Sequence, residues 1–113
     1  MSDEPVTDEV QLTMATMVFD AADAERAEDE LLAVLSRYVV LTRMVDGCRN
    51  VDLCASVTHQ GRHLVVQKWV SPAAQRAHFD SPLMVDMARQ CVGLLRHPPD
   101  LDLWDAASAH DLR

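Results

Sequence analysis

The residues of this chain that could carry chemistry gather in one stretch, "QKWVSPAAQRAHFDSP", at 67–82. His78 can take a proton from a phenol or an enolisable carbon, because imidazole titrates near physiological pH. Trp69, one of two tryptophans, can stack on a planar ligand. Both residues also have a structural interpretation: Trp69 as a core anchor at a strand end, and His78 as a helix cap.

Two alternating stretches, 49–59 and 62–70, predict a hairpin next to this segment. The Gln-Gly pair at 60–61 predicts a two-residue turn, which would pair Thr58 with His63. That register groups the apolar side chains on one face: Val51, Leu53, Ala55, Val57, Leu64, Val66 and Val70. The other face would carry Asp52, Cys54, Ser56, Thr58, His63, Val65, Gln67 and Trp69.

The Trp69 face is polar for a covered sheet, since it includes His63 and Gln67 in the predicted register. Buried polar groups need partners, so this face should border either a hydrated pocket or a polar subunit interface. Tyr38 lies on the apolar stripe of the preceding helix, and its hydroxyl could point into the same pocket. Core packing is its structural interpretation.

The remaining elements follow from periodicity and capping signals. A strand is predicted at 10–19 and a helix at about 23–45, with aspartates at 20 and 23 as N-cap candidates. The Ser-Pro pairs at 71–72 and 81–82 predict helices over about 72–79 and 82–96. A last strand is predicted at 100–106. Gly47 is expected to take the left-handed conformation that ends the first helix.

This order predicts an α+β fold, a ferredoxin-like βαββαβ sandwich with an antiparallel sheet and helices on one face. A single domain should span 10–106, with a disordered acidic arm at 1–9 and a frayed tail at 107–113. Strand 62–70 carries large apolar groups on both sides, so the uncovered sheet face needs a second cover. We therefore predict a homodimer formed through this face.

Composition excludes several classes of function. The net charge is −8 and the pI near 4.8, which argues against nucleic acid and anionic membranes as partners. Three widely spaced cysteines and no signal peptide predict reduced thiols and a cytoplasmic protein. No metal site is expected. His59 and His63 should project to opposite faces, and Asp100, Asp102 and Asp105 should be spread over both faces of a strand.

The chain resembles the antibiotic biosynthesis monooxygenase domain family, of the dimeric α/β-barrel superfamily. The matching features are "DGC" at 46–48 and "KWVSPAAQRAHFDSP" at 68–82. Gln67 stands where many relatives carry Glu. The haem-degrading branch uses an Asn on the first strand and a His on the later helix, where this chain has neither. The resemblance therefore implies no haem and no other cofactor.

The resemblance implies a cofactor-independent monooxygenase that acts on a small aromatic or enolisable molecule. His78 would be the base, Trp69 the stacking wall, and Gln67, His63 and Tyr38 the substrate-binding groups. Two alternatives are open: a non-catalytic dimeric module that binds a small molecule, and an isomerase-like enzyme that moves a proton without oxygen.

Overall fold

The computed structural model describes residues 12–107, so the predicted arm at 1–9 and the tail from 108 onward lie outside the described residues. The elements run β1 (Thr13–Asp20), α1 (Ala27–Thr42), β2 (Cys48–Ala55), β3 (Arg62–Trp69), α2 (Pro72–Phe79), α3 (Pro82–Gln90) and β4 (Asp100–Asp105). The predicted βαββαβ order is confirmed, with the second helical segment divided between α2 and α3.

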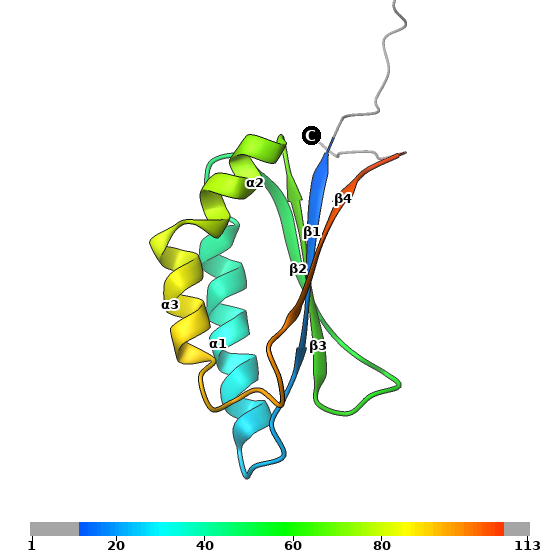
Figure 1. Ribbon diagram of the computed structural model, residues 1–113, viewed down its shortest axis with the longest axis vertical. Helices are drawn as coiled ribbons and strands as arrows, with labels where there is room; N and C mark the ends of the chain where they lie inside the picture. The colour runs from blue at the N-terminus through cyan, green and yellow to red at the C-terminus, as the bar shows by residue number, and fades with distance from the viewer. Residues whose placement is uncertain (1–11, 108–113) are drawn as a thin grey trace, which may run out of the picture.

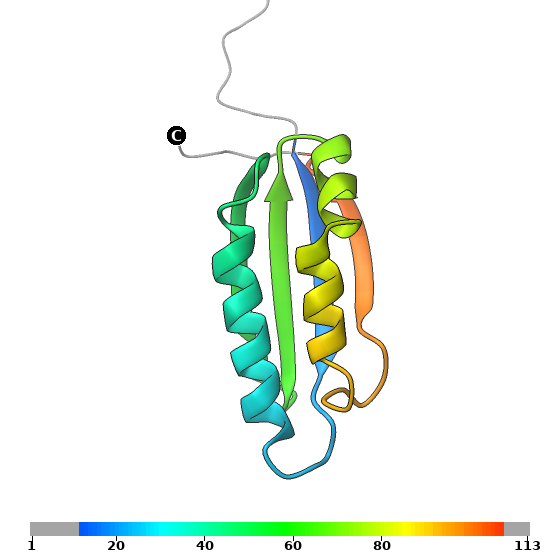
Figure 2. The ribbon, with the colours of Figure 1, turned by 90° about the vertical axis from the view of Figure 1, so that its left-hand side faces the viewer.

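The strands form one antiparallel sheet in the order β2-β3-β1-β4. All described helices lie on one face of the sheet, and no element within residues 12–107 covers the other face (Figure 1). Seen from the helix side, α1 lies in front of β2, β3 is visible in the gap between α1 and α3, and α3 lies in front of β1 (Figure 2). This arrangement confirms the α+β ferredoxin-like fold.

Strict alternation along β1 and β3 builds the core between the sheet and the helices. Every second residue of β1 and of β3 is buried, as expected for strands with one covered face. The helices complete the core with Leu31, Leu35, Val39 and Met87. Among residues 12–107, no helix has both the length and the apolar character needed to cross a bilayer.

The two Ser-Pro signals work as predicted. Ser71 and Ser81 are the N-caps of α2 and α3, and their hydroxyls accept hydrogen bonds from the backbone N–H groups of Ala74 and Met84. The predicted start of α1 is wrong. That helix begins at Ala27 after a left-handed N-cap residue whose side chain makes no capping hydrogen bond. The acidic side chains at 28–30 nevertheless fill its first turn, where the helix dipole favours negative charge.

The predicted hairpin register is wrong by an odd number of residues. β2 ends at Ala55, which pairs with His63, and the chain turns through residues 56–61 rather than through two residues. The longer turn allows Val51 and Leu53 to face the helices together with Val65, so apolar residues of both strands enter one core.

The longer turn also changes which polar residues share the Trp69 face. Ser56 and Thr58 leave the sheet and bond to each other in the turn, at 3.3 Å between their hydroxyl oxygens. Cys54 pairs with Leu64 on the uncovered face and is exposed. His63 and Gln67 remain on the helix-facing side with Trp69, as predicted.

Helix α3 ends at Gln90, not near 96. Gly93 follows with φ 83°, and the chain then runs beside the end of β1. The N–H of Ala22 donates to the carbonyl of Leu94 at 2.7 Å, and the N–H of Arg96 donates to the carbonyl of Asp20 at 2.9 Å. In a longer helix these backbone groups of residues 94–96 would bond within the helix. Here they bond to the end of β1 instead and extend the sheet at that point.

Gly47 holds the first helix-to-strand turn against α2. Its φ is +84°, and a Cβ added there would lie 2.7 Å from the Cβ of Ala74. The carbonyl of Gly47 also accepts the N–H of Val70 at 2.9 Å. The absence of a side chain thus permits both the left-handed turn and a close contact with the start of α2.

Gly47→Ala should lower the free energy of unfolding by more than Gly93→Ala does. Gly93 has φ +83° but nothing within 4 Å of an added Cβ, so its substitution costs only about 1–2 kcal/mol of backbone strain. At Gly47 the clash adds about 1–3 kcal/mol. Urea unfolding of both variants measures the difference, and equal losses would contradict the packing role.

Candidate active site

Four of the five side chains proposed from sequence meet under the helices at one end of the sheet. Gln67 and Trp69 come from β3, Tyr38 from α1 and His78 from α2. All four are buried, with 0–2% of each side chain exposed. Ser71 caps the start of α2 and so determines where along that helix His78 lies. Tyr38 lies on the buried stripe of α1, which faces the sheet.

These four side chains form a continuous hydrogen-bond chain. Trp69 Nε1 donates to Gln67 Oε1 at 2.9 Å, and Gln67 Nε2 donates to the Tyr38 hydroxyl at 2.6 Å. The Tyr38 hydroxyl lies 2.6 Å from His78 Nε2. The chain has a direction because an indole N–H can only donate, so it fixes the orientation of the Gln67 amide.

Two acceptors for the proton of the Tyr38 hydroxyl are His78 Nε2, at 2.6 Å, and the sulfur of Met84, at 3.6 Å. Burial raises the pKa of Tyr38, and the nearby Thr42 hydroxyl opposes that rise. A thioether is a weak acceptor, so donation to the imidazole dominates in the free protein. His78 then carries its own proton on Nδ1. If the hydroxyl turns to Met84, His78 instead donates from Nε2, and its Nδ1 lone pair becomes available.

His78 Nδ1 is buried and has no hydrogen-bond partner in the described structure. Its ring lies between the indole of Trp69, with centroids 4.7 Å apart, and the ring of Tyr38, at 5.6 Å. A buried polar atom without a partner costs free energy. The arrangement therefore holds an unsatisfied imidazole nitrogen in a fixed position, where a ligand could supply the missing partner.

Burial controls the protonation of this cluster. Desolvation lowers the pKa of His78, which favours neutral imidazole. Desolvation also raises the pKa of Tyr38 to about 12, although the hydrogen bond from Gln67 opposes the shift. At neutral pH the phenol therefore keeps its proton and the imidazole is uncharged, so the pair can move a proton without first losing one to solvent.

Tyr38 connects the cluster to a groove between α1 and α3. The groove has a volume of about 60 Å³, and its walls include Leu83 and Met87 together with the charged side chains of Arg37 and Asp86. That volume admits a few water molecules or dioxygen, whereas sites for drug-sized ligands span roughly 300–1,000 Å³. A ligand of that size would fit this groove only if α1 and α3 moved apart.

His63 does not join the other four side chains. It pairs with Phe19 and Ala55 toward the opposite end of the sheet, and its Nδ1 is also buried without a partner. His59 lies in the exposed turn. In the part of the chain that the structure describes, no group of three or more His, Cys, Asp or Glu side chains could hold a metal ion.

Two contributors to this site were missed from sequence. Met84 lies in the helix predicted at about 82–96, and its sulfur contacts the Tyr38 hydroxyl. Arg37 precedes Tyr38 and lies at the edge of the same helical stripe, beside the groove. The sequence signal for Arg37 is its position next to Tyr38, which lies on the apolar stripe of α1. The contact of Met84 has no such signal, because it depends on how α3 packs on α1.

The sequence model of the antibiotic biosynthesis monooxygenase family matches residues 14–90, more than half of the chain. The chain belongs to the antibiotic biosynthesis monooxygenase family. The match covers β1 through α3 and therefore includes all four members of the hydrogen-bond chain. The family resemblance inferred from sequence is confirmed. No curated protein gives a significant match.

Solved structures share the fold. Rv0793 from Mycobacterium tuberculosis is 26% identical with a TM-score of 0.74, covering 82% of this chain and 92% of its own. A structure described as an antibiotic biosynthesis monooxygenase is 21% identical with a TM-score of 0.72, covering 85% and 98%. NE2512 from Nitrosomonas europaea, described as of unknown function, is 14% identical with a TM-score of 0.80, covering 92% and 97%.

Tyr38→Phe should destabilise the fold by about 2–4 kcal/mol, because it leaves the Gln67 amide and His78 Nε2 buried without partners. Ser36→Ala, an exposed change on the same helix, should stay within about 0.5 kcal/mol of wild type. Denaturant unfolding checks both values. A Tyr38→Phe protein as stable as Ser36→Ala would contradict the hydrogen-bond chain.

Proposed function

We propose that this protein is a cofactor-independent monooxygenase acting on a small aromatic or enolisable molecule. The proposal rests on the buried, uncharged imidazole of His78, which lies between the rings of Trp69 and Tyr38. Only one of its two nitrogens has a hydrogen-bond partner. An imidazole that acts as a general base must be unprotonated at the working pH and must offer the substrate a nitrogen with a free lone pair. Family membership supports the same class of reaction.

The proposed reaction starts with transfer of a substrate proton to His78 Nδ1. The resulting carbanion is electron-rich and reacts directly with dioxygen. For a CH₂ centre next to a carbonyl or aromatic ring, the C–H bonds supply the electrons. One oxygen atom enters the product as a carbonyl and the other leaves as water. No external reductant is needed, because the substrate C–H bonds supply the electrons that reduce dioxygen.

The base-competent state uses the second arrangement of the hydrogen-bond chain. Tyr38 turns its O–H toward Met84, and its oxygen then accepts from both Gln67 Nε2 and His78 Nε2. This frees the Nδ1 lone pair and stabilises the imidazolium that forms when the substrate proton arrives. Trp69 serves as the stacking wall, and Gln67 and Tyr38 hold His78 in position. His63 makes no contact with these four side chains, so its proposed contact with substrate oxygens does not form part of this scheme.

Gln67 favours a second candidate function, a dimeric module that binds a small molecule without turning it over. Gln67 cannot take a proton as a carboxylate can, and both ends of its amide are engaged within the core. An isomerase-like enzyme would use the same proton transfer without oxygen. Turnover of a substrate under anaerobic conditions would identify the isomerase, and saturable binding without turnover would identify the module.

Oxygen uptake with a panel of anthrones and quinols tests the monooxygenase proposal. Wild type should consume oxygen, and His78→Ala should lose about 10²–10⁴-fold in rate, the usual contribution of a general base. Ser36→Ala, which is exposed on α1, serves as the control and should match wild type.

Two results would overturn this assignment. Uptake by folded His78→Ala at the wild-type rate would remove His78 as the base. No uptake by wild type on any member of the panel, despite saturable binding, would replace the monooxygenase with the binding module. A melting curve for each variant separates loss of activity from loss of fold.

We also propose that the protein works as a homodimer joined through the uncovered sheet face. That face presents apolar side chains from neighbouring strands: Met14, Val18, Leu64, Val66 and Trp104. Trp104 is 54% exposed although its indole N–H donates to Thr16 Oγ1 at 3.0 Å. A second copy offers a face of the same shape and character, as an isologous interface requires.

The free cysteines of the described chain fit the proposed reducing, cytoplasmic location.

Val66→Asp should convert the dimer to a monomer, because it places a charge in the middle of the proposed interface. Val57→Asp introduces the same charge at a side chain that is 99% exposed in the turn, and it should leave the mass unchanged. Light scattering at micromolar concentration measures the mass. A wild-type mass equal to one chain of 12.6 kDa would contradict the proposal.

A further inference from the structure

A hollow opens at the end of the sheet away from Trp69, where β1 and the β2–β3 turn meet the segment before β4. Its volume is about 310 Å³, and its walls include His59, Gln60, Arg62, Arg96 and His97 around Asp20. Asp20 pairs with Arg62 at one end of the β1–β3 ladder, while Thr13 pairs with Trp69 at the other. At the usual rise per residue, the hollow and the His78 cluster are roughly 24 Å apart.

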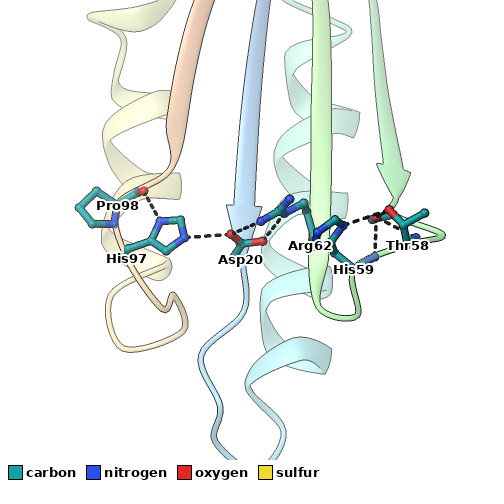
Figure 3. A network of polar contacts seen from close by, with 7 residues as sticks. Asp20, Thr58, His59, Arg62, His97 and Pro98 are labelled. Carbon is teal, nitrogen blue, oxygen red and sulfur yellow. Dashed lines mark hydrogen bonds and ion pairs between the residues drawn. The ribbon is translucent and has the colours of Figure 1, made fainter.

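Asp20 organises the cationic groups of the hollow. It accepts from Arg62 Nε at 2.7 Å and Nη2 at 3.1 Å, and it lies 2.9 Å from His97 Nε2 (Figure 3). The other nitrogen of His97 is 2.8 Å from the carbonyl oxygen of Pro98. An imidazole with an acceptor at each nitrogen satisfies both only as the cation. These same two hydrogen bonds raise the pKa of His97 and so favour its charged form.

Several donors remain unused after these contacts. The Arg96 side chain makes no hydrogen bond or ion pair with any residue in 12–107. His59 Nδ1 lies 3.0 Å from the Thr58 hydroxyl, and in the tautomer in which Nδ1 accepts from that hydroxyl the ring N–H is on Nε2 and is free to donate (Figure 3). Arg62 bonds to Asp20 through Nε and Nη2, which leaves Nη1. These donors belong to the same hollow, together with the Gln60 amide.

The charges around the hollow favour an anion in a protein whose net charge is −8. Arg62, Arg96 and protonated His97 outnumber Asp20 and the nearby Asp100, and both carboxylates already face cations. A neighbouring hollow shares Arg96 and Gln60 but is bordered by the carboxylates of residues 23, 28 and 29. An anion would be repelled there and held on the His97 side.

We propose that this hollow binds a small oxyanion, the phosphate or carboxylate group of a metabolite. Arg96 is the principal ligand, with His59 and Arg62 supplying further N–H groups. Charge-assisted hydrogen bonds from a guanidinium suit both kinds of group, because each presents paired oxygens. The site is separate from the proposed monooxygenase chemistry and does not depend on it.

Titration of the protein with inorganic phosphate and, separately, with malonate tests this site at constant ionic strength. NMR should show saturable shifts of the amides of Ala21, Gly61 and Arg96 with at least one of the two anions. Saturation with phosphate alone indicates a phosphate group as the ligand, and saturation with malonate alone indicates a carboxylate.

Arg96→Gln should weaken the anion that saturates by about tenfold, the loss of one charge-assisted hydrogen bond. Arg96→Lys should retain part of the affinity. Arg89→Gln is the matched control, since it removes the same charge from an exposed position on α3, and it should change affinity less than twofold. Shifts that never saturate with either anion, or equal weakening in Arg96→Gln and Arg89→Gln, would overturn the proposal.

Discussion

The indole N–H of Trp69 can only donate a hydrogen bond, and the candidate active site depends on that constraint. It orients the Gln67 amide, which then donates to Tyr38 and leaves the phenol proton for His78. Each of these side chains is buried, so a break at any link leaves polar atoms without partners. The same contacts tie β3, α1 and α2 together, and the site and the fold are stabilised by one set of hydrogen bonds.

This coupling explains why the chemistry proposed here needs motion. A fully packed cluster disfavours the charged form of His78, and the groove between α1 and α3 that Tyr38 borders is small. Met84 lies at this seam and is also the second acceptor for the Tyr38 proton. Separation of α1 and α3 would therefore admit a ligand and, at the same time, alter the hydrogen bonding of Tyr38.

Local signals predicted the elements well, because each depends on a few neighbouring residues. The Ser71 and Ser81 caps and the left-handed Gly47 are examples. The hairpin register failed because a Gln-Gly pair does not specify a two-residue turn strongly, and packing of Val51 and Leu53 against the helices decided the pairing. The meeting of Tyr38 with His78 was anticipated only as a shared pocket, since residues 40 positions apart meet through tertiary packing.

The protonation state of His78 is the most direct test of this account. Nitrogen NMR of the imidazole ring, followed through a pH titration, should show a neutral His78 at neutral pH, with its pKa below the ordinary value of 6.5 because the ring is desolvated. The signal should report one protonated and one unprotonated nitrogen at neutral pH, and the shift should move back toward 6.5 when Tyr38→Phe loosens the cluster. A His78 that titrates at or above 6.5 in the folded wild type would contradict the buried, uncharged base.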